Sequence, residues 1–158
     1  MTTKAKQLKQ LVRFYPPYLG AGVRVTHVSD DFSTVHVEMP LRFYNRNYVG
    51  THFGGSLYSM CDPFYMIMLI NLLGPDYIVW DKAATIRFKK PGKGLVKASF
   101  HISPKEVEAI REAAESHGKV EPTFQVSVTD NNGNVIAEIE KLLYVRKKET
   151  GQPANRER

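Results

Sequence analysis

The sequence contains one cysteine, Cys61, and no uninterrupted apolar run of the roughly 18 residues that a membrane-spanning helix needs. A single cysteine forms no internal disulfide, and the apolar neighbours of Cys61 predict a packing role for it. The segment that begins at Met1 is charged and lacks the apolar stretch typical of a secretory signal. We therefore expect a cytoplasmic protein without a membrane partner.

Signs of metal chemistry and of nucleic-acid binding are also scarce. The histidines show no mutual spacing typical of metal ligands, so we expect no metal site. The formal net charge is +6, but the sequence shows no basic helix and no stripe of basic and aromatic residues. We therefore expect no nucleic-acid partner and assign most of these charges to a solvated surface.

The composition indicates one globular unit. Hydrophobic residues make up 42% of the 158 residues and charged residues 24%, which is typical of a chain with a single core. No internal repeat or low-complexity block divides the sequence. We expect one domain over residues 1–150, followed by a polar, flexible tail over residues 151–158.

Apolar periodicity predicts the elements of the first half of the chain. Residues 4–15 have helical spacing, and Pro16-Pro17 should end that helix. Segments 22–28 and 33–39 predict a hairpin, because apolar and polar residues alternate in the second of them and a polar turn separates the two. The run 54–73 is apolar almost all round, which is typical of a helix buried on most sides.

The second half of the chain predicts a sheet around that helix. Four more strands are expected, six in total, over residues 78–89, 94–102, 123–129 and 135–146. Ser103 and Glu106 form a capping box that predicts a helix over residues 104–117. The fold class is therefore α+β, with a six-stranded antiparallel sheet wrapped around one long central helix. Such a sheet has an open edge, which pairing across a two-fold axis would cover.

The densest group of polar and glycine residues runs over residues 45–55 and is followed by Asp62. Gly54 and Gly55 begin the predicted central helix, where free backbone amides can bind an oxygen that becomes anionic. Asp62 lies about two helical turns further on, so its carboxylate and these amides would share one face. Asp62 could act as a general base or a nucleophile, or it could cap a helix that starts at Pro63.

This segment resembles the motif of the hotdog-fold thioesterases, particularly those of the phenylacetic acid pathway. The matching residues are Asn47, Gly50, His52, Gly54, Gly55 and Asp62, and the stretch 86–94 resembles the family's strand and turn. The resemblance implies the hotdog fold, a carboxylate at Asp62 that promotes attack on a thioester carbonyl, and a glycine amide that polarises the carbonyl. It further implies that Asn47 and His52 hold substrate or water. The family's sites lie between subunits, so a homodimer or a dimer of dimers is expected, with no cofactor except the coenzyme A of the substrate.

Structural roles are the alternatives for the same residues. Asn47 could serve only as a turn residue and His52 only as a loop histidine. The glycine pair could serve only the close packing of helix on sheet.

Further residues are expected to contact the substrate. Lys89, Lys90 and Lys93 cluster on a turn, where they could hold the anionic end of coenzyme A. Tyr58 belongs to a group of aromatic residues that we expect mainly in the core, although some of them could line an acyl channel.

Asp81 stands where members of the family often carry a serine or threonine beside the partner subunit's side of the site. It could contribute there, or it could form an ion pair with Lys82 or Arg87 on a neighbouring strand.

The sequence thus predicts a thioesterase that hydrolyses an acyl-CoA or a related acyl thioester. A hotdog dehydratase or hydratase is one alternative, because some of those enzymes carry a His-Phe dipeptide such as His52-Phe53 ahead of a helical acid. A module that binds acyl-CoA without turning it over is the other, and it is favoured if Asp62 only caps a helix.

Overall fold

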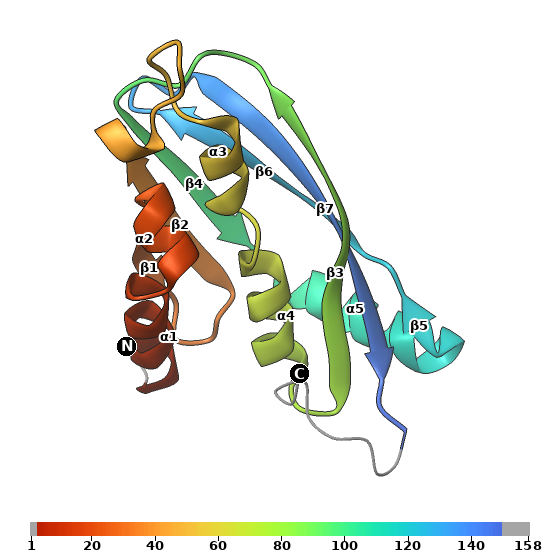
Figure 1. The fold of residues 1–158 in the computed structure, drawn as a ribbon. Helices are drawn as coiled ribbons and strands as arrows, with labels where there is room; N and C mark the ends of the chain where they lie inside the picture. Colours follow the sequence, from red (N-terminus) through yellow and green to blue (C-terminus); the bar gives the residue numbers. More distant parts are fainter. Residues whose placement is uncertain (1–2, 150–158) are drawn as a thin grey trace.

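One curved antiparallel sheet partly surrounds a central helical segment (Figure 1). The computed structural model describes residues 3–149, so the predicted tail at 151–158 lies outside the described residues. The strand order is β1-β2-β4-β6-β7-β3, and every neighbouring pair is antiparallel. This arrangement confirms the predicted fold class of a sheet around a central helix.

The strands form at the predicted places. Alternation of apolar and polar residues along each of them supplies one face that packs inward, the usual basis of a half-buried sheet. The strands are β1 (Arg24–Val28), β2 (Thr34–Pro40), β3 (Tyr77–Phe88), β4 (Leu95–His101), β5 (Lys119–Val120), β6 (Thr123–Asp130) and β7 (Val135–Lys147). The two-residue strand β5, which pairs with β7, is the one strand beyond the six expected.

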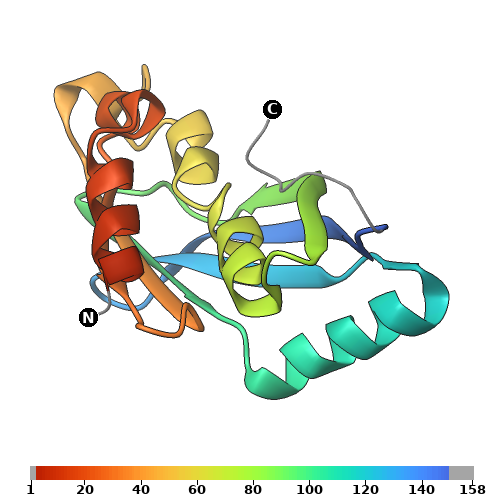
Figure 2. The ribbon, with the colours of Figure 1, turned by 90° about the horizontal axis from the view of Figure 1, so that it is seen from below.

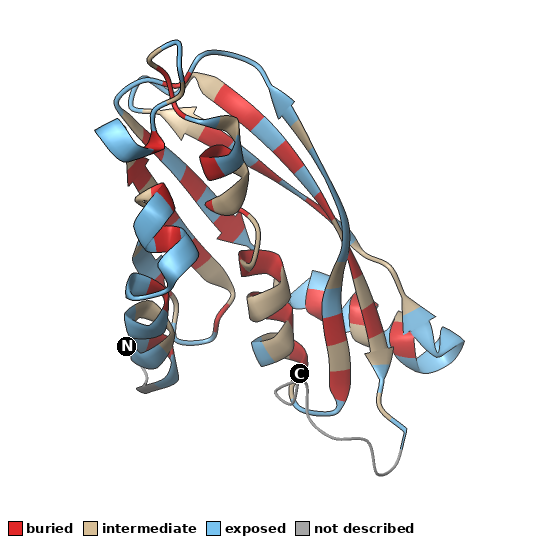
Figure 3. Cartoon of the chain, in the orientation of Figure 1, coloured by how far each residue is buried: buried red, intermediate tan, exposed pale blue. Residues whose placement is uncertain are grey.

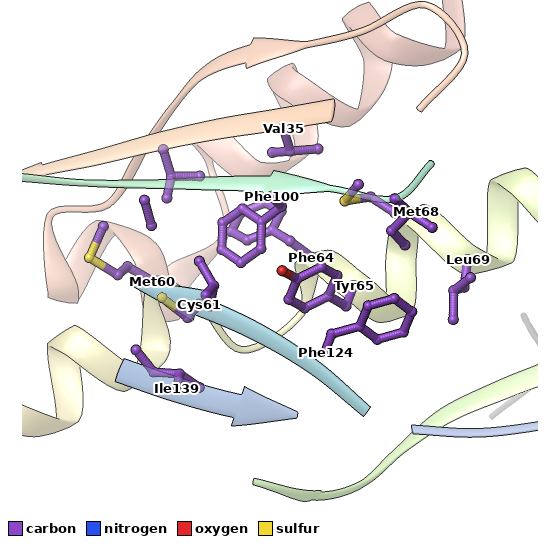
Figure 4. Packing of buried hydrophobic residues seen from close by; sticks show 14 of the residues in the cluster. Val35, Met60, Cys61, Phe64, Tyr65, Met68, Leu69, Phe100, Phe124 and Ile139 are labelled. Atoms are coloured by element: carbon purple, nitrogen blue, oxygen red, sulfur yellow. The ribbon is translucent and has the colours of Figure 1, made fainter. Parts of the chain in front are cut away.

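The core lies between the sheet and the central segment. Phe64 packs against Phe100 of β4 with 5.0 Å between ring centroids, and Tyr65 stacks on Phe124 of β6 at 4.6 Å (Figure 4). Cys61 is fully buried in this core, as the sequence predicts. Figure 3 shows the alternation of buried and exposed positions along the strands that makes this packing possible.

The central segment differs from the prediction because it is two helices rather than one. Helix α3 (Gly54–Ser59) and helix α4 (Phe64–Leu73) are separated by a turn that contains Asp62 and Pro63. Pro63 has no backbone N–H to continue α3, and it becomes the N-cap residue of α4. The break decides where the side chain of Asp62 points.

The N-terminal helix also ends earlier than predicted. Helix α1 (Thr3–Arg13) is followed by a second short helix, α2 (Pro16–Ala21), because proline suits the first turn of a helix. Leu11 and Tyr15 belong to the apolar positions at helical spacing in residues 4–15, but both are exposed. A 3-10 turn, η1 (Phe43–Asn45), follows β2.

Helix α5 (Pro104–His117) begins as its capping box predicts. Ser103 accepts a hydrogen bond from the backbone N–H of Glu106, and the Glu106 carboxylate accepts one from the backbone N–H of Ser103. Figure 2 shows α1 and α2 on one side of α4 and α5 on the other.

The segment Gly54–Leu73 is long and apolar enough to cross a membrane, with a mean hydropathy of 1.2. Core helices of globular proteins meet the same criteria. Half of this stretch is buried inside the fold, between the sheet and its flanking helices, so its apolar character is explained by packing.

Candidate functional site

The inner face of the sheet carries one buried charge, Lys141 of β7, whose side chain is only 1% exposed. Its Nζ lies 2.8 Å from Asp62 Oδ1 and 3.0 Å from Asp81 Oδ1. Tyr58 joins the same group because its hydroxyl lies 3.3 Å from Lys141 Nζ. We call Tyr58, Asp62, Asp81 and Lys141 the charged cluster.

Asp62 is held through one oxygen only. Its Oδ1 accepts hydrogen bonds from the Tyr58 hydroxyl at 2.6 Å and from Lys141 Nζ at 2.8 Å. Within residues 3–149 no group donates to Oδ2, and the side chain is 47% exposed. The alternative that Asp62 caps α4 is wrong, because the N-cap residue is Pro63 and no side chain caps this helix. The carboxylate is therefore fixed in position while one oxygen stays accessible to water or a ligand.

Asp81 reaches the cluster through an irregularity in β3. The pairing register between β3 and β7 shifts between Asp81 and Ala83, so an extra residue, Lys82, interrupts the ladder. Such a bulge re-aims side chains, and Asp81 faces Lys141 while Lys82 pairs with Glu121. An ion pair at Asp81 was expected, but its partner is Lys141 rather than Lys82 or Arg87.

Burial and charge oppose each other in this cluster. Burial of Asp81 raises the pKa of its carboxyl, and the nearby Asp62 adds to this, while Lys141 counteracts it. Burial lowers the pKa of Lys141, but the hydrogen bonds and charges of Asp62 and Asp81 outweigh it, so the net pKa of the ammonium is raised. Lys141 is consequently a permanent cation between two carboxylates at neutral pH.

A cleft of about 650 Å³ lies near the start of α3. We call it the loop cleft. It brings together six residues that the sequence singled out. They are Asn47, His52, Gly54, Lys89, Lys90 and Lys93. Leu57 and Phe88 also line it, so the cleft has both cationic and apolar groups.

Asn47 acts within its own loop. Its side chain accepts from the backbone N–H of Thr51 at 2.9 Å and donates to the Thr51 hydroxyl at 2.9 Å. The buried Asn45, which was not predicted, fixes the preceding turn by donating to the carbonyls of Ala21 and Pro40. These bonds match the alternative of a turn residue for Asn47, and they shape the wall of the loop cleft.

His52 is buried at the same wall. One ring nitrogen, Nε2, lies 2.9 Å from the carbonyl of Gly94, which can only accept, so Nε2 carries the proton. Burial lowers the pKa of His52, and the neutral ring then presents an unprotonated Nδ1. Nδ1 is buried and has no hydrogen-bond partner among the described residues.

Gly54 and Gly55 differ in their surroundings. A Cβ at position 54 would lie 2.8 Å from the ring of Phe88, so glycine is needed there for close approach of that side chain. Gly54 lines the loop cleft, whereas Gly55 does not. No hydrogen bond joins the amide of either glycine to another group within residues 3–149.

The three predicted lysines are in different states. Lys89 pairs with Glu138 at 2.9 Å, and Lys90 donates to the side chain of Asn134 at 3.0 Å. Lys93 is exposed and makes no such contact with any described residue. Of the three lysines, Lys93 can therefore bind an anion without first breaking an ion pair or a hydrogen bond.

The charged cluster and the loop cleft are separate within one chain. Asp62 and Asp81 do not line the loop cleft. Ala84 pairs with Lys141 and Phe88 with Ala137, so the two regions lie about four residues apart along β3, roughly 13 Å. The expectation that Asp62 and the glycine amides face one small volume fails within a single chain, because α3 ends before a second turn brings Asp62 onto its face.

Lys141 is the site residue that the sequence reasoning missed. Its signal was present, because Lys141 interrupts the inward-facing row of Ile139, Leu143 and Val145 on β7. A charge at an apolar position of a strand needs a buried partner.

Among the aromatic residues expected in the core, Tyr65 is buried, whereas Tyr48 and Phe53 are exposed.

No group of three or more histidine, cysteine, aspartate or glutamate side chains within residues 3–149 is arranged to hold a metal ion.

Three solved structures are similar to most of the chain. A protein of Pseudomonas aeruginosa described as "Probable Thioesterase" has a TM-score of 0.79 and 22% identity, covering 90% of this chain and 95% of its own. A protein of unknown function from Chlorobaculum tepidum has a TM-score of 0.72 and 18% identity over 92% and 95% of the two chains. A thioesterase of Haemophilus influenzae has a TM-score of 0.66 and 13% identity over 96% and 97%.

These likenesses show that the chain has the fold of these proteins, the hotdog fold. None of the curated proteins matches the chain. A family model matches residues 3–145, and the chain belongs to this family, which is described as "Domain of unknown function (DUF4442)".

Proposed function

We propose that the protein hydrolyses an acyl thioester and that its substrate is an acyl-CoA. The observation that carries this proposal is the state of Asp62, whose Oδ1 is fixed by Tyr58 and Lys141 while Oδ2 stays free. The similarity to structures described as thioesterases from Pseudomonas aeruginosa and Haemophilus influenzae supports it.

In the proposed reaction Asp62 Oδ2 accepts a proton from water as the water oxygen attacks the thioester carbonyl. The unpartnered amides of Gly54 and Gly55 stabilise the oxyanion that forms. When the carbon–sulfur bond breaks, the thiolate leaves with the bonding electrons. A thiol has a pKa of about 8.5, so no strong general acid is needed.

The proposed reaction needs two copies of the chain, because the charged cluster and the loop cleft are apart in one copy. Strand β3 is an edge of the sheet, and its residues Lys82 to Thr85 are exposed. A second β3 can pair with it antiparallel about a two-fold axis at Ala84 or Thr85, since residues directly opposite each other must point to the same face. In this homodimer the loop cleft of one copy lies beside the charged cluster of the other.

Coenzyme A fits the loop cleft by charge. Its phosphates would meet Lys93, with Lys90 and Lys89 nearby, while the apolar side chains of Leu57 and Phe88 would contact the acyl part or the pantetheine arm.

The proposal is tested by Asp62→Asn with acyl-CoAs that carry short, medium and aromatic acyl groups. Asparagine keeps the shape of the side chain and removes the base, so we expect turnover to fall on the order of 100-fold or more while the protein stays folded. Turnover is followed by release of the free thiol.

Asp76→Asn is the matched control, because Asp76 is an exposed aspartate in the turn before β3. We expect it to leave turnover unchanged. Parental turnover in folded Asp62→Asn would eliminate the mechanism.

The binding of coenzyme A is tested by Lys93→Glu. Charge reversal should raise the Michaelis constant for acyl-CoA several-fold at low salt and less at high salt, because the charge is exposed and screened. Lys105→Glu, the same change on the distant α5, should leave the constant unaltered. Equal Michaelis constants for both variants would remove Lys93 from the substrate site.

A binding module without turnover is the second candidate function. It is favoured by one observation, namely that Asp62 is ion-paired and lies outside the loop cleft of its own chain. Under this function the wild type binds acyl-CoA but releases no thiol, and Asp62→Asn leaves the affinity unchanged.

A further inference from the structure

The helices α1 and α2, the start of β1 and the turn η1 lie on one side of the molecule (Figures 1 and 3). A groove of about 560 Å³ runs between them. The apolar side chains along it include Phe14, Leu19 and Tyr44, and the cations are Lys9, Arg13 and Arg24. We call this surface the N-terminal groove. No acidic residue lines it.

The apolar side chains of this surface point outward. Phe14 is 69% exposed and Leu19 is 57% exposed, although each belongs to a segment whose neighbours Val12 and Tyr18 are buried. Phe43, the chain neighbour of the groove residue Tyr44, is exposed to 84%. Large apolar side chains gathered at one place on a surface indicate contact with an apolar phase or partner.

The residues that line the groove carry charge of one sign, and Glu38 of β2, opposite Arg24 in the β1–β2 ladder, is an acidic residue next to them. Residues 1–29 contain no aspartate or glutamate, and they include the five cations Lys4, Lys6, Lys9, Arg13 and Arg24. The turn η1 adds cations next to it, at Arg42 and Arg46. A second copy of the chain would bring the same positive charge to this face, so pairing of copies through it is opposed by repulsion. The surface is complementary to an anionic partner.

The kind of apolar residue selects among anionic partners. Phe14 and Tyr44 offer rings on which a nucleic-acid base could stack, but the aliphatic Leu19 between them offers none and favours an apolar phase instead. Leucine and phenylalanine do partition into acyl chains, and lysine and arginine beside them attract anionic lipid headgroups. Tyrosine side chains such as Tyr15 and Tyr44 favour the boundary between the two.

We propose that the N-terminal groove and its rim bind the surface of an anionic lipid bilayer. Phe14 and Leu19 insert among the upper acyl chains, and Arg13, Arg24 and Lys9 contact the headgroups. The contact is peripheral. The expectation of no membrane partner rested on the lack of a long apolar run in the sequence, and that observation concerns spanning a bilayer rather than binding to its surface. It goes beyond the proposed hydrolysis and does not depend on it.

The proposal is tested by sedimentation of the full chain with vesicles of phosphatidylcholine alone or with about 30% phosphatidylglycerol. Wild-type protein should bind the anionic vesicles at low salt, bind them less at high salt, and bind neutral vesicles weakly. Arg13→Glu should lower the partition coefficient by at least about 5-fold, the effect of losing one cation near an anionic surface. Leu19→Ser should lower it on the order of 10-fold, through lost insertion.

Lys105→Glu on α5 is the matched control for charge, and it should change the partition coefficient by less than about 2-fold. Asp62→Asn should bind vesicles as the wild type does, which separates this surface from the proposed catalysis. All four side chains are exposed or half-exposed, and circular dichroism checks that the variants are folded.

Three results would overturn the proposal. The first is no binding to anionic vesicles at low salt. The second is binding that Lys105→Glu weakens as much as Arg13→Glu does, which would mean unspecific attraction by net charge. The third is binding that Leu19→Ser leaves intact while an acidic protein competes it away, which would indicate a protein partner.

Discussion

Lys141 organises the chemistry of the inner face of the sheet. It is buried, and it binds carboxylates from the turn between α3 and α4 and from β3, so it ties two elements to β7. Removing the partner of a buried ion destabilises a fold much more than removing the partner of an exposed ion, because water cannot replace the lost contacts. The cluster therefore has a structural role, and in the proposed reaction the same lysine also holds the base Asp62.

Removal of this lysine should destabilise the fold. We expect Lys141→Met to lower the free energy of unfolding by on the order of 2–4 kcal/mol, at the lower end because Asp62 is half exposed and can be hydrated. Denaturant unfolding measures the change. Asp81→Asn in the same chain should recover part of it, since one uncompensated carboxylate is then removed.

Lys82→Met is the matched control for that experiment. It breaks the exposed pair of Lys82 with Glu121, and we expect a loss of less than about 1 kcal/mol. Equal losses for Lys82→Met and Lys141→Met would mean that the charged cluster is not a tightly coupled buried group.

At the scale of elements, short-range signals at the ends of helices decide the path of the chain. Proline starts α2, and Pro63 separates α3 from α4, so that Asp62 faces β7 instead of lying along a continuous helix. Ser103 and Glu106 satisfy each other's backbone amides at the start of α5. Sequence motifs predicted part of these helix ends. They did not decide whether the central helix continues past Pro63 or ends before it.

The cap of α5 can be measured by itself. Ser103→Ala removes the acceptor for the N–H of Glu106, and we expect the free energy of unfolding to fall by about 1 kcal/mol. The matched control is Ser116→Ala, an exposed serine inside the same helix, where alanine has the higher helix propensity and stability should stay the same or rise slightly. A loss at Ser116 as large as that at Ser103 would contradict the capping role.

At the scale of the whole molecule, the exposed edge of β3 is the place where we expect a second chain to pair. Backbone groups along an unpaired edge strand are free to pair with another chain, and few side chains protect this one. The proposed homodimer covers this edge and brings the charged cluster of one copy to the loop cleft of the other.

The dimer predicts a charge-swap result at Thr85. A residue at or next to a two-fold axis meets its own copy, so Thr85→Lys and Thr85→Glu should each weaken the homodimer, while an equal mixture should form heterodimers. Sedimentation velocity or native mass spectrometry distinguishes these species. In Thr85→Glu the new carboxylate also lies opposite Glu140 of β7, so repulsion within one chain adds to repulsion between the two copies. Thr85→Lys is therefore the better single variant for testing the dimer.

Turnover in the same samples links assembly to activity. We expect hydrolysis to fall with the dimer in each single variant and to return in the mixture. A monomeric Thr85→Lys with parental turnover would show that the site is complete in one chain.

The sequence by itself determined the order of strands and helices, the class of the fold and the loop that lines the cleft. Period-two alternation, a capping box and the glycines before α3 are local patterns, and local patterns are fixed by side-chain size and backbone freedom within a few residues. The resemblance of this loop to the motif of the hotdog-fold thioesterases brought Asn47, His52 and Gly54 into one hypothesis.

Only the tertiary structure decided the partners of Asp62 and the face of the N-terminal helices. Asp62 and Lys141 are 79 residues apart in the chain, and their contact depends on how β7 lies against the turn between α3 and α4. Likewise Arg13 and Tyr44 line one groove only because η1 packs beside α2. Charges and apolar groups act through distance in space, and a folded chain sets that distance independently of separation along the sequence.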